Sequence, residues 1–177
     1  MVTGLSDLLR MSLEGVNEQE VPLKHEMEFL RGYLEIQQIR FRDRLTVKMS
    51  IPTESLDALV PNMILQPLVE NAVTYGIALR STAGEIRIRA ERINGMLRLE
   101  VADSGKDLPH YEEELSHAGL GLTNTRARLR QLYGEAHKFR MEKRSTCSHP
   151  GSCSVSVPRG RVLPLACTSR LEPGAQS

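Results

Sequence analysis

Residues 61–76 read Pro-Asn-Met-Ile-Leu-Gln-Pro-Leu-Val-Glu-Asn-Ala-Val-Thr-Tyr-Gly, and the predicted fold is built around this stretch. Its apolar residues recur at helical spacing and form one stripe, made of Ile64, Leu65, Leu68, Val69, Ala72 and Val73. The stretch therefore predicts a helix, in which Pro67 is tolerated near the start and Gly76 acts as a left-handed stop.

Two polar residues, Glu70 and Asn71, lie beside the apolar stripe of this helix. A carboxylate and an amide on a packed helix suit a divalent cation held against a phosphate chain, because hard cations prefer oxygen ligands. The same pattern also fits an ordinary amphipathic helix with two solvated side chains, and this stretch alone leaves both interpretations open.

The composition is that of a globular protein. The chain has 177 residues, of which 40% are hydrophobic and 25% charged, enough for one domain with a core. The net charge of +1 gives no reason to expect nucleic acid or a membrane surface as a partner. No apolar run approaches the roughly 20 residues of a membrane span. The 3 cysteines gather at one end, which does not fit a disulfide framework, so we expect a cytoplasmic setting.

Helices are predicted ahead of this stretch, followed by a strand. Residues 1–16 have the pattern of a short amphipathic helix, and a second helix runs from Pro22 to about Phe41. The packing seam of the second helix is Leu23, Met27, Leu30, Leu34, Gln37 and Phe41. These helices are either core elements or a dimer-forming hairpin. Residues 44–51 alternate as a half-buried strand.

A β-hairpin is predicted after Gly76. Residues 85–93 and 96–102 alternate in polarity on either side of Asn94-Gly95, a strong hairpin signal. Asp103 continues the buried side of the second strand, where an unpaired carboxylate is costly. An adenine amino group would satisfy this carboxylate, whereas the alternative is a turn formed by Asp-Ser-Gly.

Residues 119–121 read Gly-Leu-Gly directly before another predicted helix, so backbone amides and the helix N-terminus can approach a phosphate. Thr123 or Asn124 is expected to cap this helix, and Gly134 to end it. Residues 138–144 and 152–157 are expected to form two closing strands.

These three features, Glu70-Asn71, Asp103-Ser-Gly105 and Gly119-Leu-Gly121, resemble in their order the ATP-binding domain of gyrase, heat-shock chaperones, histidine kinases and mismatch-repair ATPases. Within that group the chain resembles LytS-type sensor histidine kinases. Residues 65–72 are similar to their N-box, and residues 119–134 to their second glycine box. The strings at residues 5–10, 21–23 and 33–45, with Glu28, resemble the linker that follows the histidine-bearing helices.

The resemblance implies an α/β fold, a two-layer sandwich of a mixed sheet and helices with a short N-terminal helical segment. It divides the chain into a helical linker at residues 1–42, an ATP-binding catalytic domain at 43–158, and a tail at 159–177 that we expect to be disordered. The implied function is transfer of the ATP γ-phosphoryl group to a histidine, with ATP and Mg²⁺ bound.

The family's site residues carry over by position. Asn71 would hold Mg²⁺, and Glu70 beside it would polarise a water or the attacking group. Asp103 would accept a hydrogen bond from the adenine amino group, and Gly105 would give the base close access. The lid over the phosphates would be formed by residues that include Gly119, Gly121, Thr123 and Asn124.

The family pattern is also broken in places. Asp107 replaces a glycine of the first glycine box, and Tyr75 stands where histidine usually follows the N-box. The acceptor histidine is expected upstream of residue 1, on helices of the same parent protein or a dimer mate. The implied partners are those helices and a response regulator, in a homodimer whose parent is membrane-anchored through a separate sensor. Two alternatives are a degenerate module without catalysis and a serine kinase of the anti-sigma type.

Overall fold

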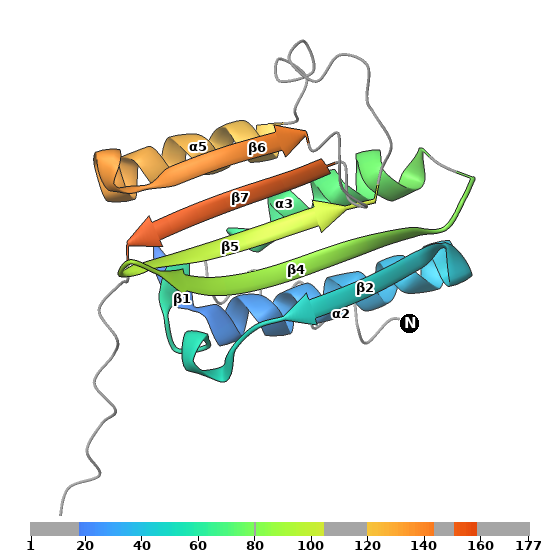
Figure 1. The fold of residues 1–177 in the computed structure, drawn as a ribbon, viewed down its shortest axis with the longest axis horizontal. Helices are drawn as coiled ribbons and strands as arrows, with labels where there is room; N and C mark the ends of the chain where they lie inside the picture. The colour runs from blue at the N-terminus through green and yellow to red at the C-terminus, as the bar shows by residue number, and fades with distance from the viewer. Residues whose placement is uncertain (1–17, 80, 105–119, 144–150, 159–177) are drawn as a thin grey trace, which may run out of the picture.

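The structure, a computed structural model, describes residues 18–79, 81–104, 120–143 and 151–158 (Figure 1). The helix predicted for residues 1–16 and the tail from residue 159 lie outside these ranges. Among the described residues, no helix is both long and apolar enough to cross a membrane.

The described residues form a mixed sheet with helices against it. The strands are β2 (Leu45–Ser50), β4 (Gly84–Ile93), β5 (Met96–Asp103), β6 (Lys138–Lys143) and β7 (Gly151–Pro158). Their order in the sheet is β2-β4-β5-β7-β6, and β2 runs parallel to β4 while the other pairs are antiparallel. A separate antiparallel pair joins β1 (Glu20–Pro22) to β3 (Leu59–Pro61).

The helices lie behind this sheet in Figure 1. They are α2 (Leu23–Phe41), α3 (Leu65–Asn71), the π-helix η3 (Ala72–Ala78) and α5 (Leu120–Tyr133), with 3₁₀ turns η1 (Arg42–Arg44), η2 (Thr53–Ser55) and η4 (Gly134–Ala136). The predicted two-layer α/β sandwich with a mixed sheet is confirmed.

The β4–β5 hairpin shows how the sequence produces the core. Asn94 and Gly95 have φ values of 51° and 76°, the positive values that a two-residue hairpin turn requires. Beyond the turn, Leu97, Leu99 and Val101 of β5 are at most 1% exposed, because alternate residues of a strand point to one face. The predicted hairpin is therefore confirmed.

Helix α2 shares its core with the sheet. Its predicted seam is buried at Leu23, Met27, Leu30, Leu34 and Phe41, and these side chains belong to one apolar cluster with the inward residues of β4, β5 and β7. The segment called a linker thus packs as part of the described fold. The boundary placed at residue 42 stays a prediction.

Two helix limits differ from those predicted. Gly76 does not stop its helix in a left-handed conformation, since it lies inside η3 and the chain continues to Ala78. The physical reason is the burial of Ile77, which is 1% exposed and keeps the chain wound against the sheet. Helix α5 begins at Leu120, so Thr123 and Asn124 are inside it and do not cap it. Gly134, with φ 54°, does follow its last residue as predicted.

Cys153 is a core residue of β7, and its environment gives a measurable prediction. Burial raises the pKa of its thiol from 9.0 to about 12. In a chain with Cys147→Ser and Cys167→Ser, we expect the native thiol to react with a disulfide reagent about a thousandfold more slowly than the unfolded chain, since the thiolate is the nucleophile.

The pKa of the Cys153 thiol is higher in the folded than in the unfolded protein. Its contribution to the free energy of unfolding is therefore fully present below pH 9.0 and is lost as the pH rises from there towards about 12. Equal reaction rates of Cys153 in native and unfolded protein would show that the thiol is not in the core.

Candidate functional site

Helix α3 carries the first pair of predicted site residues. Leu65, Leu68 and Val69 are buried and fix the helix against the core, which leaves Glu70 and Asn71 half-buried at its C-terminal end. The Gln66 side-chain amide donates to Glu70 Oε1 at 2.7 Å across one helical turn. This bond orients the Glu70 carboxylate along the helix, towards Gln66.

Asp103, the last residue of β5, lies against the helical segment that follows Asn71. A Cβ atom added to Gly76 would lie 2.5 Å from Asp103 Oδ1 and 2.6 Å from its Cγ. Real Cβ atoms do not approach other atoms so closely, so only glycine leaves room for this carboxyl group. The structure thereby places Asp103 against Gly76, which follows Asn71 of the N-box by five residues.

Ser104 fixes the end of β5 to the start of β4. Its backbone N–H donates to Glu85 O at 2.9 Å, and the Glu85 N–H donates to Ser104 Oγ at 2.7 Å. The sequence signal at Asp103-Ser-Gly105 is therefore partly structural, because the serine closes the sheet edge while the aspartate faces the helices.

Helix α5 lies beside α3 at its first turn. A Cβ atom added to Gly121 would be 3.5 Å from Pro67 Cβ, an ordinary contact distance. Thr123 and Asn124 are exposed, one turn further along. Gly105 and Gly119, as well as Asp107, lie outside the described residues.

The sequence-based prediction missed two residues of α2. Glu26 is 5% exposed, and its carboxylate accepts hydrogen bonds from the backbone N–H groups of Met63 (2.5 Å) and Leu65 (3.2 Å), at the start of α3. Tyr33 is half-buried, and its pKa is raised by burial and by the negative charge of Glu70. A signal was present for Glu26, because a charged residue between Leu23 and Met27 on an apolar seam requires a partner.

The side chains of Glu70, Asn71 and Asp103 offer oxygen acceptors to a cation or to a hydrogen-bond donor, and an anionic ligand would have to bind through such a cation. A carboxylate and an amide lie at the end of α3, and a second carboxylate lies at the end of β5 against Gly76, which follows Asn71 by five residues. Carboxylate and amide oxygens are the ligands that Mg²⁺ prefers. Because Gly76 has no side chain, its backbone lies directly against the carboxyl group of Asp103. This close contact restricts the Asp103 side chain.

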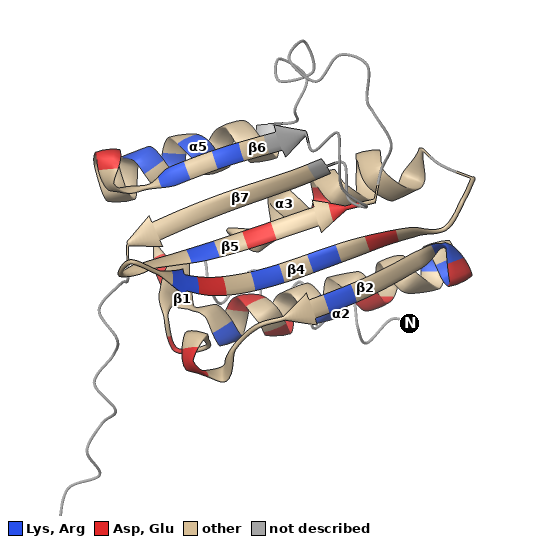
Figure 2. Cartoon of the chain, viewed as in Figure 1, with Lys and Arg blue, Asp and Glu red and all other residues tan. Residues whose placement is uncertain are grey.

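Two hollows on the described surface lie away from these side chains. One of about 340 Å³ is on the opposite face of the sheet, lined by Arg98, Lys138, Arg140, Ser154 and Ser156 among others, and another of about 420 Å³ lies between β6 and α5. Figure 2 shows the basic residues along β6 and α5. No predicted site residue lines either hollow, so we locate the site by its side chains.

Comparisons with known proteins find two family matches. Residues 57–161 match the family described as histidine kinase-, DNA gyrase B- and HSP90-like ATPase, and residues 1–45 match the family described as histidine kinase.

The similar curated proteins include sensor histidine kinase YesM of Bacillus subtilis, 33% identical over 80% of this chain and 24% of YesM. Sensor protein LytS of Oceanobacillus iheyensis is 30% identical over 78% of this chain and 26% of LytS. The chain therefore spans about a quarter of the length of the curated relatives it matches.

Solved structures share the fold. The catalytic domain of histidine kinase ThkA is similar with a TM-score of 0.62 and 21% identity, over 79% of this chain and 94% of that domain. ThkA in a complex with response regulator protein TrrA is similar with a TM-score of 0.55 and 21% identity, over 90% of this chain and 48% of the ThkA chain.

The contact between Gly76 and Asp103 predicts a specific steric coupling. Gly76→Ala is expected to lower the free energy of unfolding by about 1–3 kcal/mol, because the added methyl overlaps the Asp103 side chain. In an Asp103→Gly background the same change should cost much less, since every overlapping atom is gone. Denaturant unfolding of the four proteins measures this coupling.

Gly121→Ala is the matched control for this experiment, because its methyl would make only an ordinary contact within a helix. We expect it to be neutral or slightly stabilising. If Gly76→Ala lowers the free energy of unfolding equally with and without the Asp103 side chain, Gly76 and Asp103 are not in close contact.

Proposed function

The chain belongs to the family of histidine kinase-, DNA gyrase B- and HSP90-like ATPases, and on that premise we propose that it binds Mg-ATP as the catalytic portion of a two-component sensor histidine kinase. The sequence-based resemblance to LytS-type sensor histidine kinases agrees with the relatives that match it. A fold of this kind serves several chemistries, so the function depends on the side chains of the site.

The observation that carries the proposal is the position of Asp103 against Gly76. It joins the end of β5 to the segment that begins with Glu70 and Asn71, so that one ligand can reach both. A carboxylate held at the end of a buried strand is suited to accept a hydrogen bond from an exocyclic amino group. We assign Asp103 to the adenine, with Gly105 giving the base close access.

The phosphate end of the nucleotide is assigned to α3 and α5. Asn71 would hold Mg²⁺ through its amide oxygen, and Glu70, oriented by Gln66, would polarise the attacking group. Bound Mg²⁺ would supply neutralisation of the charge on the phosphate oxygens. Gly119, Gly121, Thr123 and Asn124 would form the lid and its hinge over the phosphates.

The proposed reaction breaks the bond between the γ-phosphorus and the β–γ bridging oxygen and forms a bond from phosphorus to an imidazole nitrogen, which loses its proton. Positioning and charge neutralisation carry most of the catalysis in such transfers. We propose that the accepting histidine lies outside these 177 residues, on helices of the parent protein or its dimer mate.

A response regulator would then take the phosphoryl group. The similarity to ThkA, solved with response regulator protein TrrA, supports this partner. We place this portion of the kinase in the cytoplasm, with any membrane anchor in the sensor of the parent protein.

Titration calorimetry of Mg-ATP into the full 177-residue chain tests the proposal. We expect a dissociation constant in the micromolar range for the parent chain. Asp103→Asn should weaken binding by about tenfold or more, because the amide cannot accept as the carboxylate does. Glu100→Gln, on the opposite face of β5, is the matched control and should leave the affinity unchanged.

Two further proteins separate this function from its alternative. Asn71→Ala should bind ATP equally with Mg²⁺ and with chelator, if Asn71 holds the metal. If the parent chain does not bind Mg-ATP and Asp107→Gly restores binding, the chain is a degenerate module in which the added carboxylate repels the triphosphate. Binding that is identical in the parent and Asp103→Asn would contradict the assigned pocket.

A further inference from the structure

The buried carboxylate of Glu26 is the feature that the proposed function leaves unexplained. It comes from α2 yet accepts hydrogen bonds from Met63 N–H and Leu65 N–H, where α3 begins. The first N–H groups of a helix have no partner within the helix, and a carboxylate there is favoured by the helix dipole. Glu26 therefore caps, from another helix, the helix that ends in Glu70 and Asn71.

A charge from a third helix acts on the same carboxylate. Burial raises the pKa of Glu26, while the backbone amides and the positive charge of Arg128 lower it. Arg128 belongs to α5 and is itself partly buried, with an Nε atom that has no hydrogen-bond partner among the described residues. Arg128 thus attracts Glu26 from α5, the helix that begins at Leu120 and carries the proposed lid residue Gly121.

Helix α2 also reaches the other end of α3. Tyr33 lies two helical turns beyond Glu26, and its pKa is raised in part by the charge of Glu70. Helix α2 is therefore hydrogen-bonded to the start of α3, and it is coupled electrostatically to Glu70 at the other end of α3 and to Arg128 of α5. Displacement of α2 would break its bonds to the start of α3 and so shift the helix that carries Glu70 and Asn71.

We propose that Glu26 is a positioning residue for the nucleotide site, which sets the start of α3, and hence Glu70 and Asn71, through its bonds to Met63 and Leu65. The positive charge of Arg128 on α5 supports that role by favouring the ionised carboxylate. The proposal rests on the proposed binding of Mg-ATP. It assigns a direct physical route from α2, which lies within the predicted linker at residues 1–42, to the helix that carries Glu70 and Asn71. A simple cap would stabilise α3 without any dependence on Arg128.

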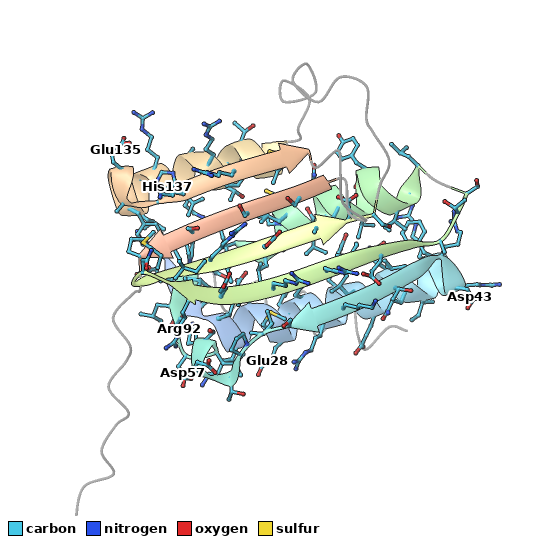
Figure 3. The ribbon with its side chains drawn as sticks, in the orientation of Figure 1. Glu28, Asp43, Asp57, Arg92, Glu135 and His137 are labelled. Carbon is cyan, nitrogen blue, oxygen red and sulfur yellow. The ribbon has the colours of Figure 1, made fainter. Side chains whose placement is uncertain are left out.

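A double-mutant cycle on nucleotide affinity tests this proposal. Glu26→Gln keeps the side-chain volume but removes the charge and one acceptor, and Arg128→Met removes the opposing charge. We expect each change to weaken Mg-ATP binding by about fivefold or more, and the double variant to be about as weak as the weaker single variant. Glu28→Gln, exposed on the same helix (Figure 3), and Arg130→Met, exposed on α5, are the matched controls and should not change affinity.

Hydrogen exchange of the nucleotide-free chain gives a second measurement that does not depend on ATP. Glu26→Gln should speed exchange at the amides of Met63 and Leu65, and Arg128→Met should do so to a smaller extent. Because these variants could also lose global stability, the exchange of β4 and β5 amides serves as the internal reference.

The outcomes separate this proposal from the proposed function. If the parent binds Mg-ATP and Glu26→Gln lowers the melting temperature without changing affinity, Glu26 is only a cap and the proposal is overturned. Independent, multiplying losses in affinity would likewise exclude coupling to Arg128. If the parent binds no nucleotide, the function fails, and unchanged exchange at Met63 and Leu65 would then overturn the positioning role as well.

Discussion

The fold depends on a carboxylate that is buried away from water. Ionised groups are expensive to bury unless other groups replace the lost hydration. Buried Glu26 obtains this replacement from the backbone N–H groups of Met63, just ahead of α3, and Leu65, its first residue. Helices α2 and α3 can therefore pack only in the arrangement that brings these two N–H groups to the carboxylate. Apolar burial alone would allow α2 to slide along the core, because hydrophobic contacts have no direction. The directional bonds remove that freedom and fix where α3 begins, and hence where its last two residues end.

A second constraint acts where α3 ends. The π-helical η3 winds Gly76 against Asp103 so closely that no side chain fits between them. π-Helical turns are rare and occur often at functional sites. Together, the carboxylate at one end of the segment and the glycine at the other hold Glu70 and Asn71 between two fixed points. Rigid placement of this kind is what a site needs when its chemistry depends on positioning.

Much of the fold could be predicted because its signals are local. The alternation around Asn94-Gly95 and the seam of α2 each arise from residues close in sequence, and both predictions are confirmed. The β1–β3 pair and the capping of α3 by Glu26 join residues far apart in sequence, so no periodicity reveals them. Gly76 shows a different limit. The sequence predicts a glycine in the left-handed conformation here, but Gly76 is required because it lacks a Cβ atom. A sequence does not distinguish these two reasons for a glycine. The roles of the predicted site residues, by contrast, stay proposals that the resemblance supports.

The connections between the strands affect the order in which the sheet forms. Strands β4 and β5 are joined by a two-residue turn, and their pairing closes only a short loop. Strand β2 joins β4 in parallel after a long crossover through α3 and η3, and β7 reaches β5 from the far end of the chain. Loop closure over long separations is slow because its entropy is lost before the contacts form. We therefore expect the hairpin to form early, and α2, α3 and α5 to dock later. Substitutions in the hairpin would then slow folding, whereas those at the helix contacts would chiefly accelerate unfolding. The nucleotide site would be the last part to assemble and the first to open.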